Sequence, residues 1–328
     1  MIVFTEAAAP VVRPGEFDLA GRRVAVRAVA YAGEAGPPSF RFDPLQLRFV
    51  ARRHEGAVAA GPADPEVWRE ALARLPAGAV AIEACSAAEA VRGAYRAAAD
   101  GARCAGRGVY LIDPEPEGLP ETPDRSTVVV VSWRPGPLPS VLATAARAGF
   151  GTGLAAPILP GWTAEGDYWE SLLDAASAAG ATFVAPLPPA CDGDARRLIV
   201  AARAADDPVA GDGFFEEVHH GGWSAKLPPL LADARAACAR RGLALLPPRP
   251  VGTGEPAVNA AAAAFLEERA REKEADEHRQ ALLHAAVRWI DEWGRDLAGV
   301  VKEGNFRKIF PFGADVAAEA EAALLGVR

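Results

Sequence analysis

TVVVVSWRPGPLPSVLATAARAGFGTGLAAPILPGWTAEGDYWESLLDAASAAGATFVAPLP, residues 127–188, alternates short apolar runs with segments of helical periodicity. The alternation predicts three strands separated by two helices, at 127–133, 138–148, 152–159, 165–179 and 181–187. Short apolar strands joined by helices of this length are typical of βαβ units, in which the strands run parallel. The stretch therefore predicts an α/β fold built on a parallel sheet.

Apolar runs elsewhere in the chain predict four further strands, at 22–31, 79–83, 108–112 and 243–246. Together with the central stretch they make six or seven βα units, and the economical arrangement of such units is a complete or partial β/α barrel. An open doubly wound sheet is the alternative, but no GxGxxG motif follows the first strand. The barrel is the preferred interpretation.

Three segments do not fit these units. Residues 1–21 contain prolines and a glycine and are expected to form an irregular lead-in. The pattern at 42–50 fits either a strand or a short helix. The proline- and acid-rich segment 113–125 fits either a lid or a long turn.

The last part of the chain is predicted to be a long helical extension, residues 257–328, on a barrel domain at 1–256. Residues 265–280 carry six acidic and four basic side chains and are expected to form a solvated helix. Apolar residues recur at helical spacing from Leu282 to Val301, and this face is expected to pack on the barrel.

The segment GNFRKIFPFG, residues 304–313, places three phenylalanines close to the end of the chain. Phe306 and Ile309 are expected to turn into the domain, whereas Phe310 and Phe312 flank a proline and are expected to be able to point elsewhere. The aromatic content favours a contact between the C-terminal helix and tail and either a protein partner or a second copy of the chain.

Composition excludes several classes of protein. The 328 residues carry a net charge of −8, which argues against general nucleic-acid binding because that needs a basic face. No apolar run approaches the ~18–20 residues of a membrane span, and the N-terminus does not have the pattern of a signal peptide. The four cysteines are far apart and form no metal-binding motif, so a cytoplasmic, reduced protein is predicted.

Residues at the predicted strand ends are the candidates for chemistry, because β/α barrels place their active sites at the carboxyl ends of the strands. Glu83 and Asp113 end neighbouring strands, where they fit either an acid/base or cation-binding pair or two strand-end caps. Arg134 fits either a clamp for an anionic group or a surface residue in a turn. Glu83, Asp113 and Arg134 are the predicted catalytic residues, with Ser132, Trp133 and Pro157 as predicted ligand contacts.

The histidines give no comparable signal. His219 and His220 are adjacent, so their side chains point in different directions and are unlikely to share one metal ion. Glu216 and His220 would share a face only if this segment were helical. A solvated loop is the preferred interpretation, and no metal site is predicted. GxSxG, HExxH and Walker motifs are absent from the sequence.

The segment AARAGFGTGLAAPILPGWTAEGDYWESLLDAASAAGATFVAPLPP, residues 145–189, resembles the later half of a radical SAM barrel of the spore photoproduct lyase-like branch. Under this resemblance the turn from Pro157 to Trp162 is either a pocket wall, which adds Trp162 to the predicted ligand contacts, or only a turn that determines the fold, which is the preferred interpretation. That family holds a [4Fe–4S] cluster through a CxxxCxxC loop after the first strand. The corresponding loop here, AGEAGPPSFRF, contains no cysteine, so no iron–sulfur cluster is expected, and the sequence leaves any other cofactor unidentified.

Three functions follow as hypotheses. The preferred one is a cluster-less radical SAM-like barrel that acts as a binding module or pseudoenzyme subunit with a protein partner. The second is a barrel enzyme that acts on a small anionic substrate through Glu83, Asp113 and Arg134. The third is an assembly protein that uses the charged helix at 265–280.

Overall fold

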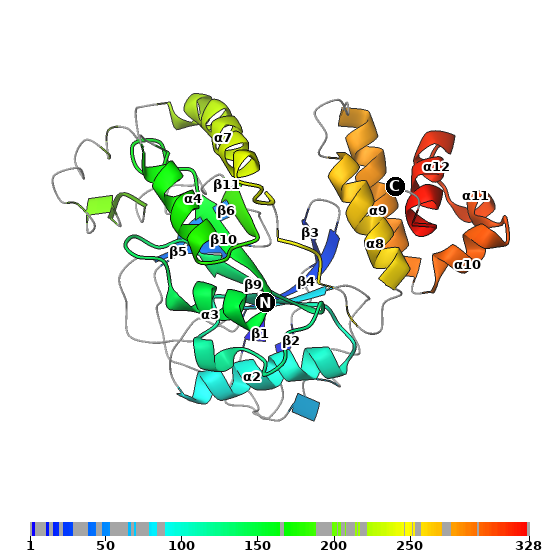
Figure 1. The fold of residues 1–328 in the computed structure, drawn as a ribbon, viewed down its shortest axis with the longest axis horizontal. Helices are drawn as coiled ribbons and strands as arrows, with labels where there is room; N and C mark the ends of the chain where they lie inside the picture. The colour runs from blue at the N-terminus through cyan, green and yellow to red at the C-terminus, as the bar shows by residue number, and fades with distance from the viewer. Residues whose placement is uncertain are drawn as a thin grey trace.

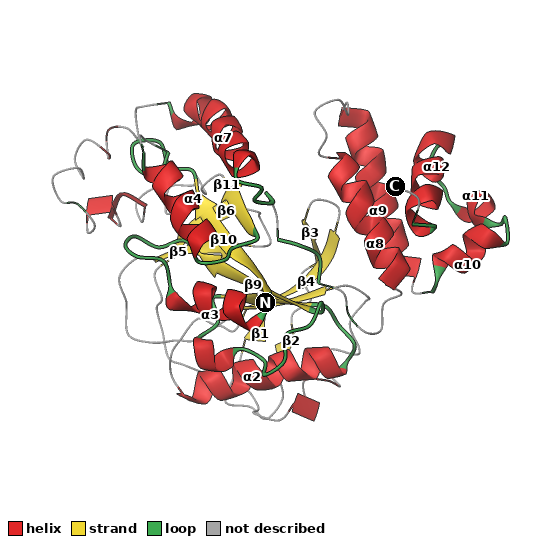
Figure 2. Cartoon of the chain, viewed as in Figure 1, coloured by secondary structure: helices red, strands yellow, loops and turns green. Residues whose placement is uncertain are grey.

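The structure, a computed structural model, describes residues 89–164, 167–187, 222–245, 247–250, 257–270, 277–293 and 295–326. It also describes seven short strands before residue 84, and isolated residues at 65, 66, 69, 199–201, 203, 204, 207, 214, 216 and 252. Figures 1 and 2 show a sheet flanked by helices, with a further group of helices at the C-terminal end. The chain is thus a mixed α/β protein, as the sequence predicts.

The central sheet has seven strands in the order β11-β10-β9-β8-β7-β4-β3. The strands are β3 (Glu16–Leu19), β4 (Arg22–Ala28), β7 (Ala79–Glu83), β8 (Val109–Ile112), β9 (Thr127–Ser132), β10 (Gly151–Pro157) and β11 (Phe183–Leu187). All neighbouring pairs from β4 to β11 are parallel, and β3 is antiparallel to β4. The three strands predicted within 127–188 are confirmed, with ends that differ by up to two residues.

The helices of the sheet region lie on one side of it. They are α2 (Glu89–Cys104), α3 (Ser140–Ala148), α4 (Tyr168–Ala178) and α7 (Trp223–Arg240). From β7 to β11 each strand adds beside the previous one in the same direction, and crossovers between parallel strands are right-handed, so every crossover falls on the same face. Helices α2 and α3 contact the strands they connect, and α7 contacts β11 and α4 (Figure 1).

The crossover from β8 to β9 contains no α-helix. Residues 113–126 make this connection with one 3₁₀ turn, η1 (Pro116–Gly118), which lies against α2 and α3. Arg96 on α2 donates a hydrogen bond to the carbonyl oxygen of Glu117. The segment predicted as a lid or a long turn therefore packs on the helical face.

The opposite face of the sheet is covered by the N-terminal part of the chain. Strands β5 (Ser39–Asp43) and β6 (Arg48–Arg52) form an antiparallel hairpin that contacts β9 and β10, two interior strands whose other face is occupied by α3. The ambiguous segment at 42–50 thus contains strand residues. Strands β1 (Ile2–Val3) and β2 (Val11–Val12) pair with each other, and β3 joins the main sheet, so the prediction of an irregular lead-in was wrong.

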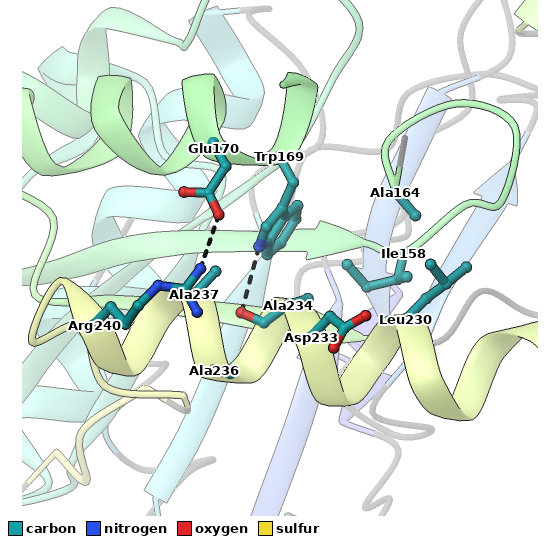
Figure 3. A pocket seen from close by; sticks show the side chains of 10 residues that line it. All are labelled: Ile158, Ala164, Trp169, Glu170, Leu230, Asp233, Ala234, Ala236, Ala237 and Arg240. Atoms are coloured by element: carbon teal, nitrogen blue, oxygen red, sulfur yellow. Dashed lines mark hydrogen bonds and ion pairs between the residues drawn. The ribbon is translucent and has the colours of Figure 1, made fainter. Parts of the chain in front are cut away.

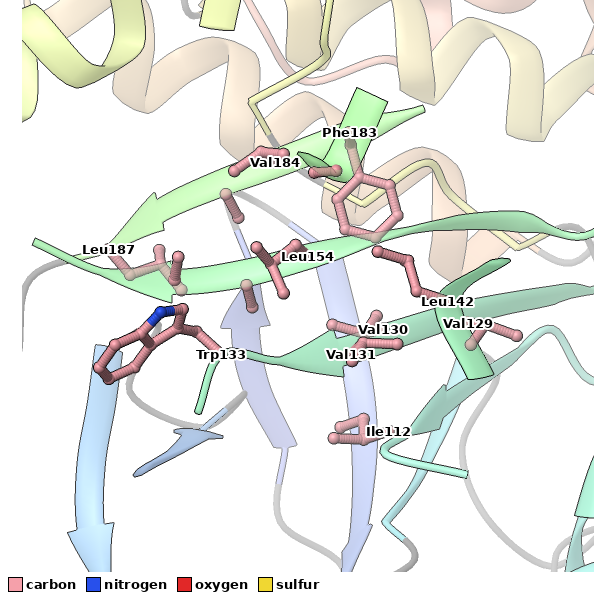
Figure 4. Close-up of a cluster of buried hydrophobic side chains, with 14 of the residues drawn as sticks. Ile112, Val129, Val130, Val131, Trp133, Leu142, Leu154, Phe183, Val184 and Leu187 are labelled. Atoms are coloured by element: carbon pink, nitrogen blue, oxygen red, sulfur yellow. The ribbon is translucent and has the colours of Figure 1, made fainter. Parts of the chain in front are cut away.

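The sheet core is built from small and branched apolar side chains. Every residue of β9 is buried, as expected for a strand covered on both faces (Figure 4). Gly153 on β10 pairs with Phe183 on β11, and the absence of a side chain at Gly153 leaves room for the Phe183 ring. Leu142 of α3, which is fully buried, belongs to the same cluster.

The two edges of the sheet are different. Beyond β11, Ala244 forms a single parallel bridge with Phe183, in place of the strand predicted at 243–246. At the other edge, β3 is the outermost strand and runs antiparallel to its neighbour β4. Among the described strands no pairing joins the two edges into a closed ring, so the structure shows a parallel α/β sheet and leaves its closure open.

The C-terminal helices form a second cluster of buried residues. They are α8 (Ala257–Ala270), α9 (Glu277–Trp293), α10 (Leu297–Lys302), α11 (Phe306–Ile309) and α12 (Ala314–Leu324). Helix α9 packs mainly on α8, and it also contacts both β4 and α12. The expectation that its apolar face packs on the barrel was therefore incomplete, because the extension supplies most of its own core. Glu267 of α8 is buried, contrary to the solvated helix expected there.

The aromatic tail belongs to this second cluster. Phe306 is fully buried, as predicted, and its ring stacks on Phe310 with centroids 4.7 Å apart. Phe310 also contacts Trp289 edge-to-face at 5.2 Å and is buried, so the expectation that it is able to point elsewhere was wrong. Ile309 is 37% exposed, so the expectation that it turns into the domain with Phe306 was wrong.

None of the described helices is both long enough and apolar enough to cross a bilayer.

Candidate functional site at the carboxyl edge of the sheet

The residues predicted from the strand ends lie along one edge of the sheet. Glu83 pairs with Ala28 and with Ile112, the residue before Asp113. Ser132 pairs with Ala155, two residues before Pro157. Because these strands are parallel, their carboxyl ends share one edge, as predicted. The side chain of Glu83 lies outside the described residues, so its proposed pairing with Asp113 remains a prediction.

Asp113 is the buried carboxylate of this edge, with only 2% of its side chain exposed. Its Oδ1 accepts a hydrogen bond of 2.6 Å from the N–H of Ser132, and its own N–H donates to the carbonyl oxygen of Val130. β8 ends at Ile112, so the Asp113 side chain, in place of a backbone carbonyl of β8, accepts the hydrogen bond from the Ser132 N–H of β9. Its backbone has φ +49°, the left-handed region that aspartate tolerates better than most residues.

The second oxygen of Asp113, Oδ2, is buried and has no hydrogen-bond partner among the described residues. The nearest described cation is the guanidinium of Arg134, whose Nη2 lies 3.8 Å from Oδ2. This distance allows electrostatic attraction but is too long for a hydrogen bond. The Arg134 side chain is 49% exposed, so the edge presents a solvent-accessible cation with a buried anion beside it.

Aromatic residues form the neighbouring wall. Trp133 is buried and donates its indole N–H to the hydroxyl of Tyr168 at 2.9 Å. The rings of Trp133 and Trp162 meet edge-to-face with centroids 5.2 Å apart. The guanidinium of Arg203 lies 5.2 Å from the centre of the Trp162 ring, a cation–π contact. The structure thus brings Trp133 and Trp162 together, and both are largely covered by other side chains.

The turn after β10 is organised by Thr163, which the sequence analysis did not identify. The fully buried Thr163 hydroxyl accepts a hydrogen bond from the N–H of Leu159 at 2.8 Å and donates to the carbonyl oxygen of Pro157 at 2.5 Å. Gly161 has φ +77°, a conformation that favours glycine. A threonine shortly after a Pro-Gly pair is the signal that was available, because hydroxyl groups commonly bridge tight turns.

Replacement of Thr163 by valine tests this role of the hydroxyl. Valine has nearly the same shape but leaves the buried Leu159 N–H and Pro157 carbonyl without a partner, so we expect a loss of about 1–3 kcal/mol in the free energy of unfolding. Urea unfolding of Thr163→Val, with Thr144→Val on the more accessible surface of α3 as the control, measures it. Equal stabilities of the two variants would show that the turn does not depend on the hydroxyl.

Metal-ligating side chains do not gather in the part of the chain that is described. No group of three or more His, Cys, Asp and Glu residues with metal-site geometry occurs there. Cys238 on α7 is buried, and burial raises the pKa of its thiol to about 11, so it is not a thiolate at neutral pH. Cys104 is exposed. Cys85, Cys191, His219 and His220 lie outside the described residues.

A separate cavity of about 260 Å³ lies between α4 and α7 (Figure 3). Its lining is largely alanine and other apolar side chains, with Trp169 donating to the carbonyl oxygen of Ala234 at 3.4 Å. Glu170 and Arg240 form an ion pair across it at 3.0 Å. The predicted catalytic and ligand-contact residues do not line this cavity. Its charged pair is satisfied internally, so it resembles a helix–helix packing groove.

The carboxyl edge therefore has two chemical capabilities. Arg134 offers a planar set of N–H donors to an anion, and Asp113 offers a buried carboxylate oxygen to a hydrogen-bond donor. Helix α3 begins at the end of the loop that carries Arg134, and no side chain caps its N-terminus.

Comparison with known proteins yields no match to a family model, to a curated protein or to a solved structure.

Proposed function

We propose that this chain binds a small anionic ligand at the carboxyl edge of its sheet, with Arg134 as the anion-binding residue and Asp113 as its positioning residue. The observation that carries the proposal is the Asp113–Arg134 pair, a buried carboxylate on a left-handed backbone beside a half-exposed guanidinium. Unusual backbone conformations of non-glycine residues concentrate at functional sites.

The position of the pair within the fold supports this function. In sheets of parallel strands, ligands bind beyond the carboxyl ends of the strands, where the loops to the following helices meet. Arg134 lies in such a loop, between β9 and α3. The charge of the guanidinium favours a negatively charged group there.

We propose further that the sheet is the wall of a partial β/α barrel. The consecutive strand order from β7 to β11 and the placement of all crossovers on one face support this architecture. That this barrel is a radical SAM-like one without the iron–sulfur cluster stays a proposal of the same kind. On this view the chain is a ligand-binding module or a pseudoenzyme subunit. The role proposed for a protein partner would depend on surfaces other than Phe306 and Phe310, which are buried.

Removal of the guanidinium tests the proposed site. Thermal unfolding is measured with phosphate, pyrophosphate, succinate and citrate at constant ionic strength, for the wild type and for Arg134→Gln. At least one anion should raise the melting temperature of the wild type, because ligands that bind only the folded state stabilise it. Its affinity should fall about tenfold or more in Arg134→Gln, since a charged hydrogen-bonding partner is lost.

The matched control is Arg147→Gln, an exposed arginine at the other end of α3. It removes the same charge from the helix that follows the Arg134 loop, away from the carboxyl edge, so it should keep the response to the anion. Equal responses of the two variants, or no response of the wild type to any of the four anions, would contradict the proposed function.

A further inference from the structure

We infer that the ligand of this edge carries an ammonium group next to its anionic group, as an α-amino acid does. The inference deepens the proposed function and rests on it. It starts from the acceptor that the fold leaves open, the buried Oδ2 of Asp113, which has no hydrogen-bond partner in the described part of the chain.

An uncompensated carboxylate is costly at this position. A buried acceptor without a donor costs roughly 1–3 kcal/mol, and more when it is charged. Arg134 compensates part of the charge but lies at 3.8 Å, so it does not supply the missing hydrogen bond. A ligand ammonium would supply both the positive charge and the donor, which a neutral hydroxyl would not.

The geometry of the pair fits two neighbouring opposite charges. Asp113 Oδ2 and Arg134 Nη2 are 3.8 Å apart, and in an α-amino acid the ammonium nitrogen and the carboxylate carbon are bonded to the same α-carbon. A ligand of this kind places its ammonium on Asp113 and its carboxylate on Arg134, with no charge of the pair left uncompensated. A plain carboxylate would satisfy Arg134 and leave Asp113 as it is.

Access to Asp113 is provided by the mobility expected of Arg134. The Asp113 carboxylate is covered, whereas the arginine beside it is long and half exposed. Such a side chain has several rotamers of similar energy, so it can move outward with the ligand carboxylate, and the inference requires this movement to open a path to the aspartate.

Equilibrium dialysis against defined mixtures tests the inference. One mixture contains the twenty proteinogenic L-amino acids, and the second contains acids that lack the amine, including 4-methylpentanoate, 3-phenylpropanoate and glutarate. Mass spectrometry measures which compounds the full-length protein retains. We expect retention of at least one amino acid, at least tenfold tighter than its amine-free analogue.

Two variants separate the roles of the residues. Asp113→Asn keeps an oxygen for the Ser132 N–H and tolerates the left-handed backbone, so it should fold. Its affinity for the amino acid should fall about tenfold more than its affinity for the amine-free acid, because the ammonium loses its charged partner whereas the acid loses only the positioning of Arg134. Arg134→Gln should lose affinity for both the amino acid and its amine-free analogue. Asp174→Asn, an exposed carboxylate on α4 paired with Arg241, is the control and should bind as the wild type does.

The outcomes distinguish this inference from the proposed function. Arg134-dependent retention of plain acids without preference for the amino acid would overturn the inference alone. Unchanged amino-acid binding in Asp113→Asn would do the same. Retention of no compound, beside an Arg134-dependent response to one of the four anions, would overturn the inference alone. Retention that does not depend on Arg134 would overturn both.

Discussion

Replacement of Phe306 by alanine is expected to lower the free energy of unfolding by about 3–5 kcal/mol. The side chain is fully buried, stacks on Phe310 and meets Trp289 edge-to-face with centroids 6.1 Å apart. Removing it leaves a cavity between α9 and α11 and removes both ring contacts. Urea unfolding, followed by the fluorescence of the neighbouring tryptophans, measures the change.

Ile309 supplies the matched control because it lies on the same four-residue helix and is 37% exposed. Ile309→Ala should change the stability by less than about 1 kcal/mol. A small effect at Phe306 would mean that the tail is not part of the core of the helical extension. In that case the tail aromatics would again be available for contact with another chain.

Substitution of Gly153 by alanine is expected to have a comparably large effect on the sheet. A Cβ at this position would overlap the carbonyl oxygen of Phe183 and lie 2.6 Å from atoms of its ring. Two strands that pair directly cannot both shift without breaking the ladder, so we expect a loss of about 3 kcal/mol or more. Urea unfolding and the yield of soluble protein are the measurements.

The control for backbone entropy is Gly299→Ala within α10, where no atom lies within 4 Å of the added carbon. Alanine is a better helix former than glycine, so this variant should gain roughly 0.5–1 kcal/mol. If Gly153→Ala lowers the free energy of unfolding and Gly299→Ala raises it, the loss at Gly153 is due to packing and not to backbone entropy. A tolerated Gly153→Ala would show that β10 and β11 are not paired in the described register.

The sheet could be predicted from the sequence because its strands are covered on both faces. Continuous apolar runs such as Val128–Val131 leave few alternatives to a buried strand, and the intervening helices have the right length for crossovers. The N-terminal strands β3, β5 and β6 were harder to predict. They are short, and a brief alternation of apolar and charged residues also occurs in loops. Their pairing depends on contacts with distant parts of the chain, which local patterns do not encode.

The candidate site was predictable in position but not in detail. The ends of the strands gave Asp113, Ser132 and Arg134, which the structure places at one edge. The left-handed backbone of Asp113 and its hydrogen bond to the Ser132 N–H could not be predicted, because they depend on where β8 stops relative to β9. The burial of Phe310 was missed because a proline next to it suggests a helix end and says nothing about the direction of the ring.

The consecutive strand order has a consequence for how the protein folds. From β7 to β11 every strand pairs with the one that precedes it in the chain, so each addition closes a loop of limited length. The entropy lost in closing a loop grows with its length, and folds rich in such near-sequence pairings reach the native state faster than folds with distant ones. This half of the sheet can therefore grow strand by strand from β7 onward, each new strand meeting an edge that is already formed as the chain is synthesised.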